Sequence, residues 1–569
     1  MNYTGARIVI ECLIEQGVDT VFGYPGGAIL NIYDELYKNK NRLRHILTAH
    51  EQGASHAADG YARSSGKVGV VMATSGPGAT NLVTGIATAY MDSVPIVAIT
   101  CNVITPLLGK DSFQEIDITG VTMPITKHNF IVRDVRQLAD TIREAFFIAK
   151  TGRPGPVLID IPKDVTAASC DYEPAQSPFD TRFAKRKASL HRIMKVCDIP
   201  DEKIDKLASL INASERPFIY AGGGVIISDA CEELKALAEK AQIPVSTSLM
   251  GKSAFPNTHA LSTGMIGMHG TKASNTAVDR CDLLLAIGTR FSDRVIGDPK
   301  RFAGRAKIVQ IDIDPAEVNK NIAVVDSLVG SIKDALSRLV PLVEKRKASE
   351  WNAKIDEWKT EVPRSRKQNG KLSPKSIFEY VNGSVPPDTI ITTEVGQHQM
   401  WTALFYHFEK PRTFLTSGGL GTMGFGTGAA IGAQFANPDK TVVHFAGDGS
   451  FRMNCNELAT ISHYGLPIII VVFNNGALGN VRQWQTLFYE KRYSATTLDF
   501  APDFVKLADA YEVTGVRVTS EAEFKKAFDA ALVSGKPAVI DAAIDKDEMV
   551  LPMIPPGKSV DRIMMDIDL

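Results

Sequence analysis

Closely set cysteines are missing from this sequence. Its seven cysteines are odd in number and show no CxxC spacing: Cys12, Cys101, Cys170, Cys197, Cys231, Cys281 and Cys455. Disulfide frameworks and cysteine zinc sites need such pairs, so we expect neither. Unpaired thiols are typical of a reducing compartment, which predicts a cytoplasmic protein.

Long apolar runs and an excess of charge of one sign are also missing. No stretch approaches the roughly 20 apolar residues of a membrane span. With 63 basic and 64 acidic residues, the net charge of −1 gives no reason to expect nucleic acid or an anionic membrane as a partner. Glu11 and Glu15 lie among the apolar residues of the segment 1–17, which predicts an amphipathic helix rather than a signal peptide.

The chain does contain a sustained alternation of short apolar runs and helical patterns. Its 569 residues suggest three or four domains, at a soft prior of about 150 residues each. Buried parallel strands are predicted over 68–74, 95–100, 156–162, 282–288 and 441–449, and helices over 203–212, 231–241, 429–436 and 521–533. The predicted fold class is α/β with doubly wound parallel sheets, and polar stretches at 171–192 and 341–373 are the predicted linkers.

The strongest chemical signal is the turn Gly-Asp-Gly-Ser at 447–450, followed by Asn474 and Asn475. Both segments follow apolar runs, so two parallel strands should bring Asp448 and Asn475 together at their carboxyl ends, where α/β sheets bind ligands. Mg²⁺ prefers such oxygen ligands with a phosphate partner, and the Ala477 carbonyl would add a third. The glycines would let a diphosphate approach the backbone. The spacing and the asparagine pair disfavour the alternative of an ordinary glycine turn.

This pattern resembles the thiamine-diphosphate (ThDP) signature of the pyruvate decarboxylase and acetohydroxyacid synthase superfamily, and matching motifs run from residue 20 to residue 560. The resemblance implies three doubly wound domains: PYR (1–175), central (190–342) and PP (372–549), followed by a tail (550–569). It also implies a homodimer or homotetramer whose active sites are shared between subunits. The implied ThDP contacts are Val395, Gly396, Gln397, His398, Gly421, Met423, Gly447, Asp448, Gly449, Ser450, Asn475, Ala477, Leu478 and Gly479, with Mg²⁺ on Asp448, Asn475 and Ala477.

The segment HEQGASHAADGYAR at 50–63 resembles the part of these enzymes that places a carboxyl group beside the cofactor. The resemblance makes Glu51 the proton shuttle, a role that a desolvated carboxyl would suit. The alternative for Glu51 is a surface glutamate at a helix start. For two of the implied ThDP contacts, the alternatives are a core methionine at Met423 and a structural role for His398.

Further segments resemble the synthases within that superfamily: FGYPGGAIL (22–30), DSFQEID (111–117), GRPGPVLIDIPKDVT (152–166), GMIGMHGT (264–271), RFSDR (290–294), GNVRQWQTLFYEKRYSATT (479–497) and PMIPPGKS (552–559). They imply that Gly27, Gln114 and Lys163 join Glu51 in catalysis, and that substrate meets Phe113, Met268, Arg294 and Trp484. A guanidinium fork suits the carboxylate of the second ketoacid. An apolar wall at Trp484 would favour 2-ketobutyrate over pyruvate by about 1–3 kcal/mol. The alternative for Arg294 is a surface salt bridge, and the alternative for Trp484 is a core aromatic.

The central segments resemble a flavin site. The implied FAD contacts are Arg153, Gly222, Gly223, Gly224, Thr247, Leu249, Met250, Gly267, Met268, His269, Gly288, Arg290, Asp293, Arg294, Asp312, Ile313 and Gly330. Taken alone, three glycines after a strand are a weak dinucleotide signal and fit simple turn chemistry. The synthase reaction has no net redox step, so FAD would be structural.

The resemblance therefore implies an acetohydroxyacid synthase catalytic subunit. Such an enzyme decarboxylates pyruvate and condenses it with a second pyruvate or 2-ketobutyrate, the first common step of branched-chain amino acid biosynthesis, and often pairs with a small regulatory subunit. The rivals are an FAD-free catabolic acetolactate synthase, a pyruvate oxidase and a catalytically silent ThDP-binding scaffold. The chain departs from the family pattern at 100–104 (TCNVI for TGQVP), at Asn480 (for Met) and at 425–430 (FGTGAA for FGLPAA). Ile104 is expected to alter sulfonylurea sensitivity.

Overall fold

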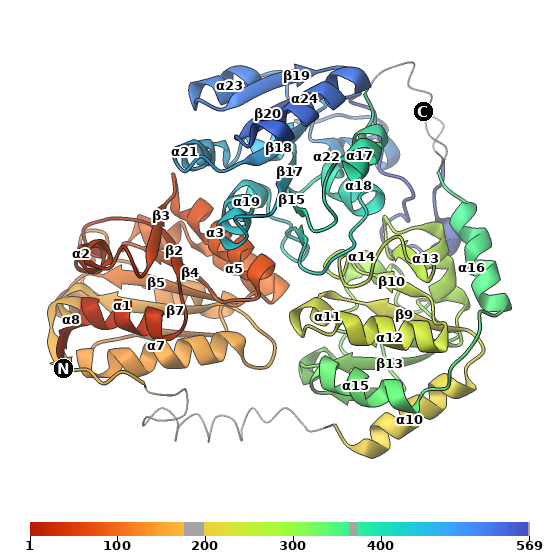
Figure 1. The fold of residues 1–569 in the computed structure, drawn as a ribbon, viewed down its shortest axis with the longest axis horizontal. Coiled ribbons are helices and arrows are strands. Elements are labelled where there is room, and N and C mark those ends of the chain that lie inside the picture. Colours follow the sequence, from red (N-terminus) through yellow and green to blue (C-terminus); the bar gives the residue numbers. More distant parts are fainter. Residues whose placement is uncertain (176–198, 364–371, 567–569) are drawn as a thin grey trace.

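Three parallel sheets organise the chain, whose computed structural model describes residues 1–175, 199–363 and 372–566 (Figure 1). Each sheet has six strands, and each lies within one of the three segments predicted from the sequence. The α/β class with three doubly wound sheets is therefore confirmed. The exact domain limits stay a prediction, and the linker residues 176–192 lie outside the described residues.

The N-terminal sheet has the strand order β3-β2-β4-β5-β7-β6. Its strands are β2 (Thr20–Tyr24), β3 (Arg44–Leu47), β4 (Gly69–Ala73), β5 (Ile96–Asn102), β6 (His128–Ile131) and β7 (Val157–Pro162). Its helices are α1 (Gly5–Glu15), α2 (Leu30–Lys38), α3 (Glu51–Ser65), α4 (Pro77–Thr80), α5 (Val83–Asp92), α6 (Ile118–Thr122), α7 (Val135–Lys150) and α8 (Lys163–Ala167), with short 3₁₀ turns η1 (Thr105–Leu107) and η2 (Met123–Ile125). The sequence analysis missed the antiparallel pair β1 (Asn2–Thr4) and β8 (Ser169–Asp171), whose three-residue strands are too short to show a pattern.

The central sheet has the order β11-β10-β9-β12-β13-β14, so the chain starts in the middle and builds outward in both directions. This order is the one that dinucleotide-binding domains use, with the ligand crevice where the order reverses. The strands are β9 (Pro217–Ala221), β10 (Val245–Thr247), β11 (Ser262–Met265), β12 (Leu283–Ile287), β13 (Lys307–Asp312) and β14 (Asp326–Val329). The helices are α10 (Asp201–Ala213), α11 (Gly223–Ile227), α12 (Cys231–Ala241), α13 (Lys272–Arg280), α14 (Asp293–Ile296), α15 (Ile332–Leu342), α16 (Glu350–Thr360) and the 3₁₀ turn η3 (Pro315–Glu317). Helix α16 occupies part of the predicted 341–373 linker.

The C-terminal sheet has the order β16-β15-β17-β18-β20-β19. Its strands are β15 (Ile390–Thr393), β16 (Phe414–Leu415), β17 (Val442–Gly447), β18 (Ile468–Asn474), β19 (Thr514–Val518) and β20 (Ala538–Ala543). Its helices are α17 (Pro374–Ser384), α18 (Gln397–Phe405), α19 (Phe425–Ala436), α20 (Asp448–Phe451), α21 (Leu458–His463), α22 (Gly479–Phe488), α23 (Phe504–Ala510) and α24 (Glu521–Ser534), with 3₁₀ turns η4 (Cys455–Glu457) and η5 (Val560–Arg562).

The predicted strands and helices are confirmed to within a few residues, because the central strands are apolar on both faces. Strands β4, β5 and β7 are buried at every position, as is usual for a parallel sheet covered by helices on both sides. None of the helices in the described ranges is both long and apolar enough to cross a membrane.

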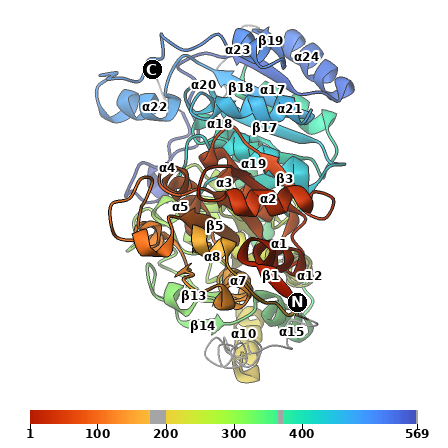
Figure 2. The ribbon, with the colours of Figure 1, turned by 90° about the vertical axis from the view of Figure 1, so that its left-hand side faces the viewer.

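The N-terminal and C-terminal sheets repeat one topology. With the strands numbered within their own sheet, each runs 2-1-3-4-6-5. The equivalent helices α3 and α19 pack against each other, as both views show (Figures 1 and 2). Side chains from the two domains form one continuous hydrophobic core there, whereas the two cores of the central domain are its own.

The contact between α3 and α19 depends on small residues. A side chain at Gly432 would collide with the Ala57 carbonyl, and one at Gly60 would collide with the backbone of Ala429. The helix backbones therefore approach more closely than larger residues would allow. This fixes the start of α3, where Glu51 lies, relative to the C-terminal sheet.

Candidate active site

The Gly-Asp-Gly turn lies at the carboxyl end of β17. Asp448 begins the short helix α20 and is 1% exposed. One of its carboxylate oxygens accepts the Gly449 N–H at 2.9 Å, and Oδ2 has no protein partner. Burial raises the pKa of this carboxyl to about 6. A buried carboxylate oxygen without a partner is costly, so the turn is built to meet a cation or a donor that the protein does not supply.

Asn475 follows β18, the neighbour of β17, so it emerges at the same edge of the sheet. Its Oδ1 accepts the Ala477 N–H at 3.1 Å, and its Nδ2 contacts Gln397 Oε1 at 3.3 Å. Among the described residues, no group of three His, Cys, Asp or Glu side chains could hold a metal. One carboxylate, one amide oxygen and a backbone carbonyl fit a hard cation such as Mg²⁺ whose shell is completed by phosphate and water.

Two helix N-termini point to the same place. Helix α18 begins at Gln397 after Gly396, and α22 begins at Gly479. Together with Asp448 and Asn475, these two helix N-termini form what we call the cradle. A side chain at Gly479 would collide with Gln397, and a Cβ at Gly447 would lie 2.9 Å from His398 Nδ1, so only glycine leaves the cradle open. His398 Nε2 is buried without a partner. Free N–H groups at helix N-termini with an open backbone suit a diphosphate, so the site fits the magnesium–diphosphate part of ThDP.

The glycine-rich segment before α19 is held by a residue that the sequence analysis did not single out. Glu394 is fully buried, and burial raises its pKa to about 7. Its carboxyl oxygens accept the N–H groups of Gly424 at 2.5 Å, Gly426 at 2.9 Å and Thr427 at 3.2 Å. These bonds fix the turn that presents the half-buried Met423.

Glu51 begins α3 and is 9% exposed. Its Oε2 accepts the Asn81 amide at 3.0 Å, and a Cβ at Gly78 would lie 3.2 Å from its Oε1. The backbone just before it is held by the C-terminal domain, since the N–H groups of Ala49 and His50 donate to the buried Glu457 at 3.2 and 3.1 Å. The acid is thus held by Asn81, with its carboxylate against Gly78.

A cavity of about 1680 Å³ opens between the three domains. Most of the predicted FAD residues line it: Arg153, Gly223, Gly224, Leu249, Met250, Met268, His269, Gly288, Arg290, Asp293, Arg294, Asp312 and Ile313. Gly222, Thr247, Gly267 and Gly330 are not part of this lining; they lie at or just after the ends of β9, β10, β11 and β14. The cavity reaches the cradle through Val395, Gly421 and Asn480.

The cavity has the size and polarity for a dinucleotide. Thr289 Oγ1 and Glu317 Oε2 are buried in its wall without partners. Asp312 ends β13, and burial raises its pKa to about 6. Arg153 reaches in from the N-terminal domain and pairs with Glu317 at 2.8 Å. These groups fit a ligand that carries hydroxyls and phosphates, as FAD does.

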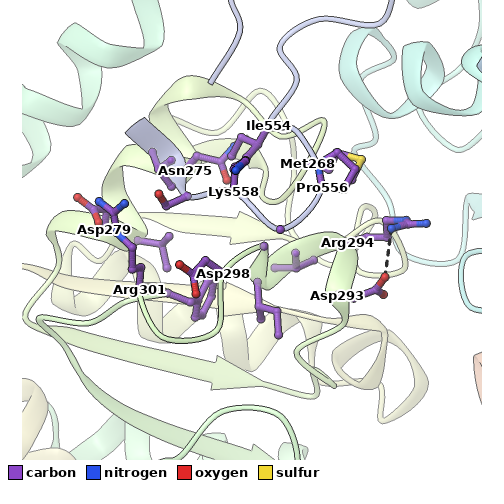
Figure 3. A pocket seen from close by; sticks show the side chains of 18 of the residues that line it. Met268, Asn275, Asp279, Asp293, Arg294, Asp298, Arg301, Ile554, Pro556 and Lys558 are labelled. Carbon is purple, nitrogen blue, oxygen red and sulfur yellow. Dashed lines mark hydrogen bonds and ion pairs between the residues drawn. The ribbon is translucent and has the colours of Figure 1, made fainter. Parts of the chain in front are cut away.

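The predicted substrate residues Met268, Arg294 and Trp484 meet at one end of this cavity. The Arg294 guanidinium lies 6.0 Å from the centre of the Trp484 ring and pairs with Asp293 at 3.1 Å. The C-terminal tail passes alongside, with the Ile554 N–H donating to the Met268 carbonyl at 2.7 Å. Figure 3 shows Ile554, Pro556 and Lys558 of the tail beside Met268 and Arg294, around a smaller pocket of about 270 Å³.

The remaining predicted residues do not reach this cavity within the chain. Glu51, Gly27, Phe113, Gln114 and Lys163 are absent from its lining. They lie in the N-terminal domain, where a Cβ at Gly76 would touch the Gln114 backbone and Phe113 is 87% exposed. The predicted site is therefore present as two parts, and Phe113 faces away from its own chain.

Comparison with known proteins agrees with this geometry over the whole chain. Residues 3–121 match the N-terminal TPP binding domain of thiamine pyrophosphate enzymes, 204–339 match their central domain, and 394–542 match their C-terminal TPP binding domain. The probable acetolactate synthase large subunit of Methanocaldococcus jannaschii is 51% identical, over 99% of this chain and 95% of that protein. The chain belongs to the acetolactate synthase large-subunit family. The large subunits of Parasynechococcus marenigrum and Corynebacterium glutamicum are each 47% identical, over 98% and 100% of this chain and 90% and 91% of theirs.

Membership of this ThDP-dependent enzyme family gives the cradle its ligand class. The family resemblance in the sequence is confirmed, and each thiamine pyrophosphate domain match covers strands of one of the three sheets only. Glu394, Glu457 and Asn81, which the sequence analysis passed over, carried no local signal, because each acts on a segment 30 or more residues away.

Proposed function

We propose that the chain is an acetolactate synthase catalytic subunit, which decarboxylates pyruvate and joins the remaining two-carbon unit to a second pyruvate or to 2-ketobutyrate. The products are 2-acetolactate and 2-aceto-2-hydroxybutyrate, precursors of valine and isoleucine. The observation that carries the proposal is the cradle of Asp448, Asn475 and two helix N-termini, in a chain about half identical to acetolactate synthase large subunits.

The cradle residues would hold ThDP and Mg²⁺. Asp448, Asn475 and the Ala477 carbonyl would bind the metal, while Gly396, Gln397, His398, Gly447, Gly449, Ser450, Leu478 and Gly479 would surround the diphosphate. Val395, Gly421 and Met423 would contact the rings. When bound, ThDP supplies an electron sink that makes loss of CO₂ from a 2-ketoacid possible.

Glu51 would hold and return a proton at its carboxyl group. Its hydrogen bond from Asn81 and its burial keep the group in one orientation and away from bulk water. Gly27, Gln114 and Lys163 would complete this half of the site. Exclusion of water matters, since stray protonation after decarboxylation would release acetaldehyde instead of the condensed product.

Arg294 would bind the carboxylate of the second ketoacid. Its guanidinium lies 6.0 Å from the centre of the Trp484 ring and pairs with the neighbouring Asp293, and the side chain is exposed, so it can present a fork to an incoming carboxylate. The Trp484 ring, Met268 and Phe113 would form the apolar wall that distinguishes an ethyl from a methyl side chain. One methylene is worth about 1–3 kcal/mol, so we expect preference and not exclusion.

FAD would fill the large cavity as a structural cofactor. The unpartnered Thr289 and Glu317 atoms and the carboxyl of Asp312 support this, together with the strand order of the central sheet. The condensation transfers no net electrons, so the flavin has no redox step to perform.

The active unit would be at least a homodimer, in which the N-terminal domain of one chain completes the cradle of another. The separation of Glu51 from the cavity supports this, as do the apolar side chains exposed on both parts. Those side chains are Ile104, Leu107, Phe113 and Met123 on one part and Leu420, Val481, Phe488 and Tyr489 on the other. A small regulatory subunit would be a further partner, as the large-subunit names of the relatives suggest.

Product analysis tests the function. Purified protein with pyruvate, ThDP, Mg²⁺ and FAD should form acetolactate, and Glu51→Gln should lose about 10²–10⁴-fold of the rate while still binding ThDP. Acetate with oxygen uptake would favour a pyruvate oxidase, and activity without flavin would favour the catabolic synthase. No turnover with intact cofactor binding would favour a silent scaffold.

A further inference from the structure

A buried ion network joins the N-terminal domain to the glycine-rich segment 416–424 of the C-terminal domain. Arg63, on α3, donates to both Asp59 oxygens, to Asp92 Oδ2 at 3.0 Å and to the Thr416 carbonyl at 2.9 Å. The Arg63 side chain is 9% exposed and both aspartates are fully buried. Asp92 is the last residue of α5, so two helices of one domain meet the other domain here.

The Asp92 carboxylate also accepts hydrogen bonds from the glycine-rich segment. The N–H groups of Gly418 and Gly419 donate to it at 3.2 and 2.7 Å. Four residues further on, the Thr88 and Thr422 hydroxyls are 2.7 Å apart. Both ends of the segment 418–422 are therefore held by side chains of α5.

One hydrogen bond lies within the segment, from the Thr422 N–H to Ser417 Oγ at 3.0 Å, and contacts from outside the segment add further support. Residues 416–424 run between β16 and α19 without helix or strand, and four of them are glycines without side chains to pack: Gly418, Gly419, Gly421 and Gly424. Gln399 and Glu394 hold the segment from its own domain, at Thr416 and at Gly424. Asp92 supplies the acceptor for the stretch between them.

We propose that Asp92, held in place by Arg63, is a positioning residue that sets the segment 417–423 for cofactor binding. The inference rests on the proposed function, since the segment includes Gly421 and Met423, which would contact ThDP. A carboxylate is required here because it accepts from Arg63 and from two backbone amides at once. If Asp92 only helped to hold the two domains together, its substitution would have the same effect as substitution of Asp59, which binds the same arginine but does not contact the segment.

The test compares Asp92→Asn with Asp59→Asn in the full-length apoprotein. The first replaces one acceptor oxygen facing the segment by an amide donor, and the second makes the same change on the far side of Arg63. Binding of ThDP with Mg²⁺ is measured by calorimetry, apart from turnover, and the thermal midpoint is recorded for each. We expect ThDP to bind Asp92→Asn about ten- to a hundredfold more weakly and Asp59→Asn less than about threefold more weakly, at similar losses of thermal stability.

Equal weakening in the two variants, or unchanged binding in Asp92→Asn, would overturn the inference. If Asp92→Asn does not fold, Thr88→Val tests the other end of the segment: a measurable loss of ThDP affinity supports the proposal, and wild-type affinity contradicts it. A wild-type protein that fails to bind ThDP would instead refute the proposed function, so the two failures are distinct.

Discussion

The N-terminal and C-terminal sheets share a strand order and also a buried polar pair. In the first, Thr100 pairs with Asp160 across β5 and β7, and Asn102 donates to the Asp160 carboxylate at 2.8 Å. In the second, Val472 pairs with Asp541 across β18 and β20, and Asn474 donates to Asp541 at 2.9 Å. The asparagine lies two residues beyond the register partner of the aspartate in both, so the two sheets can be compared residue by residue.

That register shows how the two sheets differ at the proposed metal site. Ala73 pairs with Thr100 and Ala446 with Val472, so Ala73 and Ala446 are equivalent. Two residues later, the N-terminal sheet has Ser75 where the C-terminal sheet has Asp448. After the shared asparagine, it has Val103 where the other has Asn475. The two sheets share a scaffold, and a carboxylate and an amide at two strand ends distinguish the half proposed to bind the cofactor from the half proposed to supply an acid.

Among substitutions that remove this difference between the sheets, Asp448→Asn should have the largest effect. It removes the charge that the metal needs, so affinity for ThDP with Mg²⁺ should fall by more than the roughly 100-fold typical of changes around a metal site. Calorimetric titration of the apoprotein measures it. Ser75→Ala, at the equivalent position of the other sheet, is the matched control and should bind normally; a comparable loss there would contradict the assignment.

Substitution of the two equivalent asparagines should lower stability by similar amounts but affect Mg²⁺ binding differently. Asn102→Ala and Asn474→Ala each remove a donor from a buried aspartate, at about 1–3 kcal/mol, which lowers the thermal midpoint of the apoprotein. Only Asn474→Ala should also weaken Mg²⁺ binding, because Asn475 follows it directly. Equal effects on metal binding would argue that the halves are less distinct than their register indicates.

The two aspartates differ in their charged neighbours, which gives a pH test. Asp541 accepts from Arg517 at 2.8 Å, while Asp160 accepts from the uncharged Asn102 and Thr100. Burial raises the pKa of Asp160 to about 6, and the nearby Asp117 charge adds to this rise. An unfolded aspartate titrates near 3.9, so between about pH 4 and 6 the folded state holds the extra proton and stability falls as pH rises. Relative to wild type, Asp160→Asn should therefore gain about 1 kcal/mol in unfolding free energy from pH 5 to pH 7.

Thermal unfolding of both proteins at the two pH values checks this sign. Asp541→Asn is the control: it leaves Arg517 without its buried partner and should lose stability at pH 7. A stability gap between Asp160→Asn and wild type that stays constant with pH would show that Asp160 does not titrate in this range.

The sequence was sufficient for the cradle because its parts follow strands directly. Asp448 and Asn475 each come after an apolar run, and parallel strands must end at one edge. It was insufficient for Glu394, Asp92 and Glu457, which accept backbone amides brought near by folding; Glu457 is 408 residues from Ala49. The duplicated topology was also invisible, because strand order is shared where residue identities are not. Packing between domains left no local pattern to read.

The smallest expected effect concerns how each domain holds the functional segment of the other. Asp92 of the N-terminal domain holds the C-terminal segment at Gly418 and Gly419, and Glu457 of the C-terminal domain holds the backbone before Glu51. In Glu457→Gln an amide donor would face a backbone N–H, so Glu51 should shift slightly. We expect turnover to fall about three- to tenfold with ThDP affinity nearly unchanged, the reverse of the pattern expected for Asp92→Asn. Thr460→Val, which removes only a hydroxyl from Glu457, is the control. A loss of cofactor affinity in Glu457→Gln without a loss of turnover would break this reciprocity, because the acid and the cradle would then not be positioned separately.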